Sequence, residues 1–102
     1  MRCSTGPDRA VGVQHNLAIG MLGALALDAR LRVIVLLSGV GDEGLSAGEI
    51  ARQLGLQQNT LSGHLAKLSR AGIVTSERRK TSIIYRYDRT SLENLALFLT
   101  NI

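Results

Sequence analysis

The chain has 102 residues, which is the length of a single domain. Its composition, 45% hydrophobic and 20% charged with one Pro, is typical of a globular protein and excludes a proline-rich linker. The net charge is +4, and residues 57–102 carry all of it, because their seven Lys and Arg outnumber three acids, whereas residues 1–56 balance five Arg with five acids. A basic second half indicates an anionic partner such as nucleic acid.

The cysteine and histidine content excludes several kinds of site. The single Cys3 cannot form a disulfide within the chain, so an oxidising compartment is not implied. With His15 and His64 it cannot supply the four ligands of a zinc site. No nucleophile–base pair, paired carboxylates or phosphate-cradling loop is recognisable, so we expect neither a metal cofactor nor an enzyme.

The first predicted helix follows a polar segment without periodicity. Residues 1–14 predict a flexible arm, and residues 15–102 form the predicted domain. The apolar run Leu17–Leu27 could be the core of a secretory signal or a buried helix. Polar residues precede it and it is too short to span a bilayer, so we favour the helix, a cytoplasmic protein and no membrane contact. A helix apolar on nearly all sides needs a second copy to cover it.

The second predicted helix is Ala29–Ser38, with Asp28 as its N-cap. Three apolar residues are expected to share one of its faces: Leu31, Ile34 and Val35. The glycine-rich segment 39–44 ends the helix.

A helix–turn–helix pattern occupies the middle of the chain. Ser46 and Glu49 form a capping box for a helix over Ala47–Leu54, and Gly55 is suited to end it. A helix over 57–70 follows, with an apolar stripe at Leu61, Leu65 and Leu68. Ala51, Gly55 and Leu61 stand at relative positions 0, +4 and +10. The small Ala51 lets the two helices cross closely, Gly55 permits a sharp turn, and Leu61 packs the second helix against the first, as a helix-turn-helix requires. An ordinary helical hairpin is the alternative.

The outer face of the helix over 57–70 is polar at its start and cationic further along. This order suits a helix in a major groove, with short polar groups at base edges and cations at phosphates. His64 lies at the edge of the buried stripe, where a partly buried role is favoured over a base contact. The predicted DNA-binding residues of this helix are Gln57, Gln58, Asn59, Thr60, Ser62, Gly63, His64, Lys67 and Arg70.

Two β-prone runs, 73–78 and 82–87, predict a hairpin with alternating burial in its second strand. Its tip carries Arg78, Arg79 and Lys80, which would contact phosphates as a wing beside the DNA-reading helix. Arg86 and Arg89 are weaker candidates for the same role.

The last predicted helix begins with a second capping box, Thr90 to Glu93. One of its faces carries Leu92, Leu95, Ala96, Leu99 and Ile102, while Leu97 and Phe98 point elsewhere. Two apolar faces on a terminal helix indicate a partner subunit. The residues expected in a homodimer interface are Leu17, Met21, Leu25, Leu95, Phe98 and Leu99.

From about Leu17 to Leu99 the chain resembles the ArsR/SmtB family of bacterial winged-helix repressors. The resemblance rests on the segments 28–33, 45–74 and 82–88, the first of which lacks the usual Pro. It implies a mainly α (α+β) fold, a winged helix-turn-helix of five helices with a two-stranded β-hairpin between the last two. It also implies homodimers joined by the first and last helices. The family's DNA-reading helix matches Gln57–Lys67.

The family's sensor residues are not matched in this sequence. The cysteine motif near the helix-turn-helix is replaced by residues 44–47, and the Asp/His set of the last helix is absent. Cys3 is the one possible redox residue, and one thiol per chain does not support a metal or metalloid effector. We therefore expect a homodimeric repressor that binds a palindromic operator in double-stranded DNA through helix 57–70 and wing 76–84, with or without an effector. The alternative is a winged-helix protein–protein module.

Overall fold

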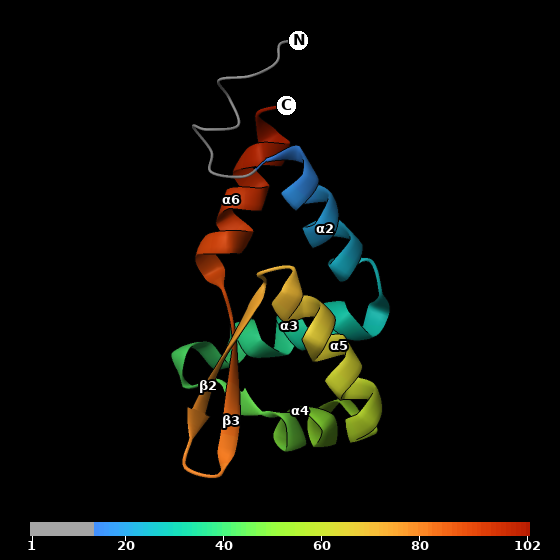
Figure 1. Cartoon of the computed structure of the whole chain (residues 1–102), viewed down its shortest axis with the longest axis vertical. Helices are drawn as coiled ribbons and strands as arrows, with labels where there is room; N and C mark the ends of the chain where they lie inside the picture. Colours follow the sequence, from blue (N-terminus) through green and yellow to red (C-terminus); the bar gives the residue numbers. More distant parts are fainter. Residues whose placement is uncertain (1–13) are drawn as a thin grey trace.

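The computed structural model describes residues 14–102 (Figure 1). Over these residues the chain forms five α-helices, one 3-10 turn and three strands, so the predicted mainly helical winged helix-turn-helix is confirmed. The helices are α2 (His15–Leu25), α3 (Asp28–Val40), α4 (Ala47–Leu54), α5 (Gln58–Arg70) and α6 (Arg89–Thr100). Of the predicted arm over 1–14, only Gln14, the N-cap of α2, lies within the described residues, and Cys3 lies outside them.

Helix α3 differs from the prediction at its start and on its inward face. Asp28 is the first helical residue, and Leu27 is the N-cap. The carboxylate of Asp28 pairs with Arg32 at 3.2 Å. The buried residues are Val33, Ile34 and Leu37, whereas Leu31 and Val35 are 51% and 64% exposed. At 100° per residue, Val35 lies about 150° from the centre of the buried set, so of the three residues predicted to share one apolar face only Ile34 is buried.

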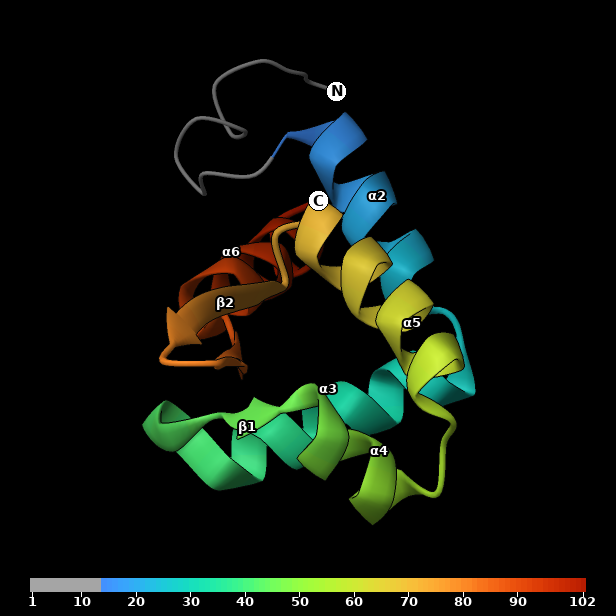
Figure 2. The ribbon, with the colours of Figure 1, turned by 60° about the horizontal axis from the view of Figure 1, so that its bottom comes forward.

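The helix-turn-helix of α4 and α5 follows the prediction closely. The amide of Glu49 donates to Ser46 Oγ at 3.2 Å, and the amide of Ser46 donates to the Glu49 carboxylate at 3.0 Å, which confirms the capping box. Gly55 ends α4 in the left-handed conformation, with φ of 69°. Figure 2 shows α5 leaving the end of α4 through this short turn and running in a different direction. The predicted apolar stripe of α5 is buried against the core: Leu61, Leu65 and Leu68.

The predicted hairpin is present and gains a third strand. β2 (Val74–Arg79) pairs with β3 (Ser82–Tyr87), and the two-residue β1 (Leu45–Ser46) pairs antiparallel with the other edge of β3. Two residues are too few to show an alternating pattern, which is why sequence reasoning missed β1. The predicted alternation in β3 holds for the two tyrosines, because Tyr85 and Tyr87 pack against the core whereas Ile84 and Arg86 do not, and it fails at Ile83, which is exposed.

Gly44 determines how closely the chain before β1 approaches β3. It is buried with a φ of 67°, and a Cβ atom there would lie 2.6 Å from the carbonyl oxygen of Tyr85. A residue with a side chain would clash with that backbone and adopt an unfavourable left-handed conformation. The base of the hairpin therefore rests directly on glycine backbone.

The N-cap of helix α6 lies two residues earlier than the predicted capping box would place it. Asp88 is the N-cap and accepts a hydrogen bond from the amide of Ser91 at 3.1 Å, whereas Glu93 pairs with Arg89 at 3.1 Å. The predicted box from Thr90 to Glu93 is therefore wrong. Leu95 is buried with Leu92 and Phe98 packed partly against the core, while three residues are exposed: Leu97, Leu99 and Ile102.

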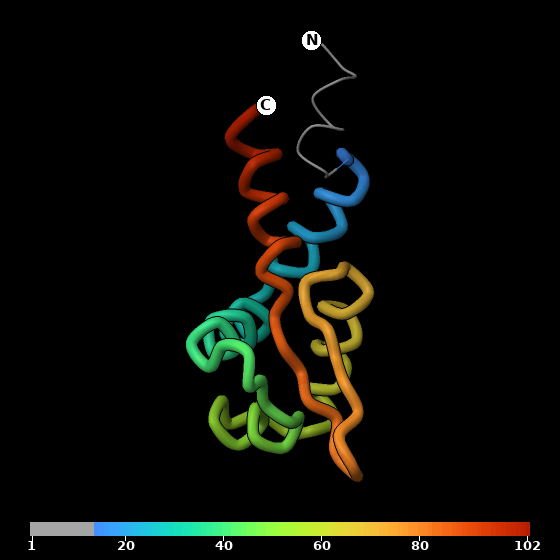
Figure 3. The backbone as a smooth tube through the Cα atoms, turned by 90° about the vertical axis from the view of Figure 1, so that its left-hand side faces the viewer, coloured from blue at the N-terminus to red at the C-terminus, as the bar shows by residue number. Residues whose placement is uncertain are grey.

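Helices α2 and α6 stand side by side at one end of the molecule, and the hairpin extends toward the other (Figure 3). Two residues predicted for the dimer interface belong instead to the chain's own core, because Met21 and Leu95 are 1% and 5% exposed. Helix α2 turns Ala18, Met21 and Ala24 inward and leaves Leu17, Ile19 and Leu22 exposed. One face of α2 and one face of α6 are thus buried in the core, and each helix has a second apolar face that is exposed.

Candidate nucleic-acid interface

The exposed face of α5 presents the predicted polar residues together. Gln57 is the N-cap of α5, and its exposed side chain makes no capping hydrogen bond. The backbone N–H groups of the first turn also lack partners within the helix. Gln58 lies against α4, with its Nε2 atom 3.2 Å from the position of a Cβ at Gly48. Eight of the nine residues predicted for this helix are exposed: Gln57, Gln58, Asn59, Thr60, Ser62, Gly63, Lys67 and Arg70.

His64 is the ninth residue, and it is half-buried. Its Nδ1 atom accepts a hydrogen bond from Arg30 Nε at 3.3 Å. This contact joins α5 to α3 and uses one of the two ring nitrogens of His64. The partly buried position favoured by sequence reasoning is confirmed, and Arg30 is a neighbour that sequence reasoning did not identify.

The tip of the β2–β3 hairpin carries the second group of predicted contacts. Arg78, Arg79 and Lys80 are exposed there, and Lys80 adopts a φ of 56° in the turn. Arg79 Nη2 is 3.9 Å from a carboxylate oxygen of Glu77, at the limit of an ion pair. Among the described residues, no ion pair involves Arg78 or Lys80. These cations are therefore free to meet an external anion.

Arg86 has a different role from the phosphate contact considered for it. Its Nη1 atom donates to Glu77 across the hairpin at 2.8 Å, and its Nε donates to the carbonyl oxygen of Asp42 at 2.6 Å. Asp42 belongs to the 3-10 turn η2 (Gly41–Glu43) that precedes β1. Arg86 thus ties both strands of the hairpin to the segment beside it. Arg89, the other weak candidate, is paired with Glu93.

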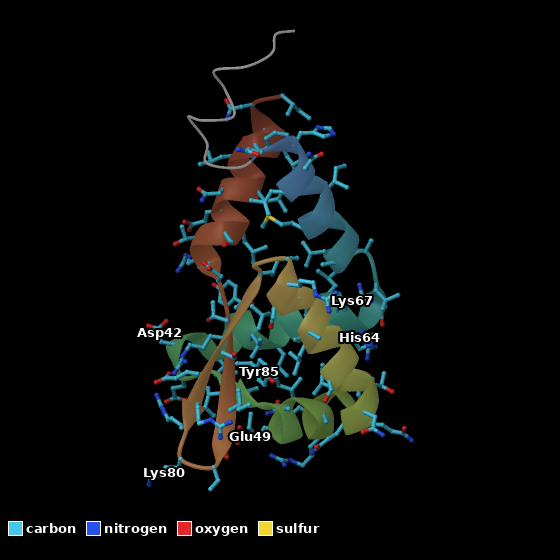
Figure 4. The ribbon with its side chains drawn as sticks, in the orientation of Figure 1. Asp42, Glu49, His64, Lys67, Lys80 and Tyr85 are labelled. Atoms are coloured by element: carbon cyan, nitrogen blue, oxygen red, sulfur yellow. The ribbon has the colours of Figure 1, made fainter. Side chains whose placement is uncertain are left out.

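The hairpin tip and the start of α5 lie toward one end of the molecule, whereas Lys67 and Arg70 lie near α2. Figure 1 shows the hairpin tip and the first turn of α5 at the end away from α2 and α6, and Figure 4 shows Lys80 at that tip with His64 and Lys67 on α5. The start of a helix carries a partial positive charge and unpaired amides, which attract phosphate. The arrangement offers a helix of groove-sized width flanked by a cationic wing.

Other kinds of site find less support in the described part of the chain. No group of three His, Cys, Asp or Glu side chains there could hold a metal ion. No helix over residues 14–102 has the length and apolar character required to cross a membrane.

Comparison with known proteins identifies the family. A helix-turn-helix domain family matches residues 25–77. The HTH-type transcriptional regulator YgaV of Escherichia coli is 32% identical over 83% of this chain and 84% of its own length. The chain belongs to the ArsR/SmtB family of winged helix-turn-helix transcriptional regulators. The expectation drawn from the sequence resemblance is therefore confirmed.

Solved structures of relatives agree with this assignment. HlyU from Vibrio cholerae, which is described as a transcriptional activator, superposes with a TM-score of 0.68 at 31% identity, covering 84% of this chain and 90% of HlyU. The homodimeric winged helix-turn-helix DNA-binding domain of Mb0332 from Mycobacterium bovis, a possible ArsR-family regulator, gives a TM-score of 0.68 at 25% identity, covering 95% of this chain and 88% of that domain. The family assignment and the fold thus rest on independent comparisons.

Proposed function

We propose that this regulator is a homodimeric repressor that binds a palindromic operator in double-stranded DNA. The observation that carries the proposal is the shared exposure of the first turn of α5 and the wing cations at one end of the molecule. Each α5 would enter a major groove, and each wing would contact the flanking phosphates. Repression would follow from steric occlusion of the promoter.

The two parts of the interface would contribute differently. Asn59, Thr60 and Ser62 project polar groups that can read base edges, and Gly63 leaves room for close backbone approach. Lys67, Arg70 and the tip residues 78–80 would neutralise phosphates, which sets overall affinity without selecting a sequence. Affinity and sequence preference should therefore respond to different substitutions.

The second copy of the chain would cover the exposed apolar surface of α2 and α6. Leu17 and Leu99, both predicted interface residues, are 48% and 41% exposed, and Ile19, Leu22 and Leu97 add to the same end of the molecule. Leu25 and Phe98 are half-buried and would lie at the edge of the contact. The homodimeric domain of Mb0332 supports this arrangement. In the dimer, two α5 helices would face half-sites about 34 Å apart or a multiple of that spacing.

The proposal extends to catalysis, cofactors and cellular location. Relatives are transcriptional regulators, and we infer that this chain acts without catalysis, without a metal or metalloid cofactor and in the cytoplasm, where its DNA target lies. HlyU is described as an activator, so the experiment must also test whether this regulator represses or activates transcription.

Binding to the DNA upstream of its own gene tests the proposal. We would footprint the regulator on that region at physiological salt and measure affinities by fluorescence anisotropy. A protected palindrome, together with reduced transcription from that promoter in vitro, is the expected result. In the same titrations, Asn59→Ala should narrow the affinity gap between operator and random DNA. Protection without reduced transcription would contradict repression, and equal binding of all sequences would contradict the operator.

A further inference from the structure

A groove between α2, α3 and α5 lies outside the face that the wing and the first turn of α5 define. Its volume is about 360 Å³, and it is shallow and widely open to solvent. Helix α2 contributes small residues to one wall, and α3 and α5 contribute three cations to the other. The lining residues are Gly20, Gly23, Ala24, Arg30, Lys67, Arg70 and Ala71.

Arg30 contacts both of the helices that form the groove with α3. Its Nε donates to His64 Nδ1 at 3.3 Å, and its Nη1 lies 3.5 Å from the carbonyl oxygen of Ala24. The residue is half-buried, so its planar guanidinium is fixed by contacts on α2 and α5. A fixed guanidinium with an unused donor edge is well suited to an oxyanion, because little side-chain freedom is lost on binding.

The groove has no compensating negative charge among the described residues. None of its lining residues is acidic, and none of the ion pairs formed within residues 14–102 includes Arg30, Lys67 or Arg70. The neighbouring acid Asp28 is paired with Arg32 instead. Three cations around one small concave surface repel one another, and an anion with several oxygens would relieve that repulsion.

We propose that this groove is a binding site for a phosphate-type oxyanion. The oxyanion is either a phosphate of bound DNA or a free anion in solution, and both would be held by the same three cations. Because two of these cations lie on α5, a free anion in the groove would compete with DNA for positive charge. The site would then act as an effector site. The competition rests on the proposed function, whereas anion binding by the free protein does not.

The first experiment uses inorganic phosphate and the full chain without DNA, at constant ionic strength. Backbone amide shifts in NMR should saturate at Gly20, Gly23 and Ala71. The double variant Lys67→Gln with Arg70→Gln should weaken binding by well over tenfold, because it removes two charge-assisted hydrogen bonds and the loss of one alone weakens binding by roughly tenfold. Arg52→Gln, which removes an exposed cation on α4 outside the groove, should leave binding unchanged.

A glycine pair provides a sharper matched control. A Cβ at Gly20 or at Gly39 meets no atom within 4 Å, so both positions accept a side chain without a clash. Gly20→Glu places a carboxylate in the groove wall and should abolish the saturable shifts. Gly39→Glu makes the same charge change on α3 away from the groove and should preserve them.

The second experiment identifies the source of the oxyanion. Operator duplexes with single neutral methylphosphonate linkages would be titrated with wild-type protein and with the Lys67→Gln/Arg70→Gln variant. If one linkage weakens the wild type but not the variant, the groove holds a DNA phosphate. If free phosphate saturates the groove and no linkage behaves this way, the site serves a free anion. Absence of both effects, with DNA binding intact, would overturn the proposal and leave the proposed function standing.

Discussion

The two ends of this regulator present opposite chemistry to their surroundings. The end formed by the first turn of α5 and the hairpin tip is polar and cationic, while the end formed by α2 and α6 exposes large apolar side chains. A charged surface attracts its partner over a distance and weakens as salt rises. An apolar surface acts only on contact and is largely insensitive to salt. One small chain thus separates DNA binding from self-association by chemistry as well as by position.

The largest expected effect comes from placing a charge at the apolar end. Ile19→Glu puts a carboxylate on an exposed position of α2 and should yield monomers by sedimentation equilibrium. Operator affinity should fall by roughly 100-fold or more, because the two half-sites would no longer be bound together. Val35→Glu introduces the same charge at an exposed position of α3 and should leave the dimer intact. A dimeric Ile19→Glu protein would contradict the division between the two ends.

A core substitution in the same helix separates folding from association. Met21→Ala removes a fully buried side chain of α2 and should lower the free energy of unfolding by about 2–5 kcal/mol. Urea denaturation would measure this. Leu17→Ala, at an exposed position of the same helix, should shift the monomer–dimer equilibrium instead. Equal effects of the two substitutions on unfolding at low protein concentration would show that Met21 is not a core residue of the single chain.

At the cationic end, Arg79→Ala should weaken binding to operator and to random DNA alike. The slope of log affinity against log salt should become shallower by about one for each phosphate that the variant no longer neutralises. Anisotropy titrations over a range of salt concentrations would measure it. Arg89→Ala serves as the control, because that guanidinium is paired with Glu93 on α6. An unchanged salt slope for Arg79→Ala would remove the wing tip from the interface.

The smallest expected effect concerns the capping box that starts α4. Ser46→Ala removes the acceptor for the Glu49 amide and should lower the free energy of unfolding by about 1 kcal/mol. Affinity for the operator should change little, because α5 and the wing keep their positions. Thermal denaturation would detect the change, and the neighbouring substitution Arg52→Ala, at an exposed position without a capping role, should not reproduce it.

Local signals in the sequence predicted the helix-turn-helix well. The Ser46–Glu49 capping box, the left-handed Gly55 and the buried stripe of α5 depend on contacts between residues close in sequence. The predictions failed where distant contacts decide. Which apolar residues of α3 face inward depends on how this helix packs, so periodicity alone groups Val35 with Ile34, although Ile34 is buried and Val35 is exposed.

The candidate site divides in the same way. The exposed residues of α5 and the hairpin tip could be predicted from helical periodicity and charge. The partners of Arg30 and Arg86 could not, because these contacts join residues 34 and 44 positions apart in the chain. No spacing rule connects Arg30 with His64, and only the packing of α3 against α5 brings them together. Structure was needed to separate the cations that are free from those that are already occupied.

The anchoring of Arg86 has a consequence for the thermodynamics of recognition. Because this guanidinium joins Glu77 on β2 to the backbone of Asp42, the strands of the hairpin are preorganised before DNA arrives. The conformational entropy that a loose loop would lose on binding has already been lost during folding. Only the side chains at the tip remain to be immobilised. The wing should therefore add to affinity with a small entropic penalty, and its bound and free backbones should coincide.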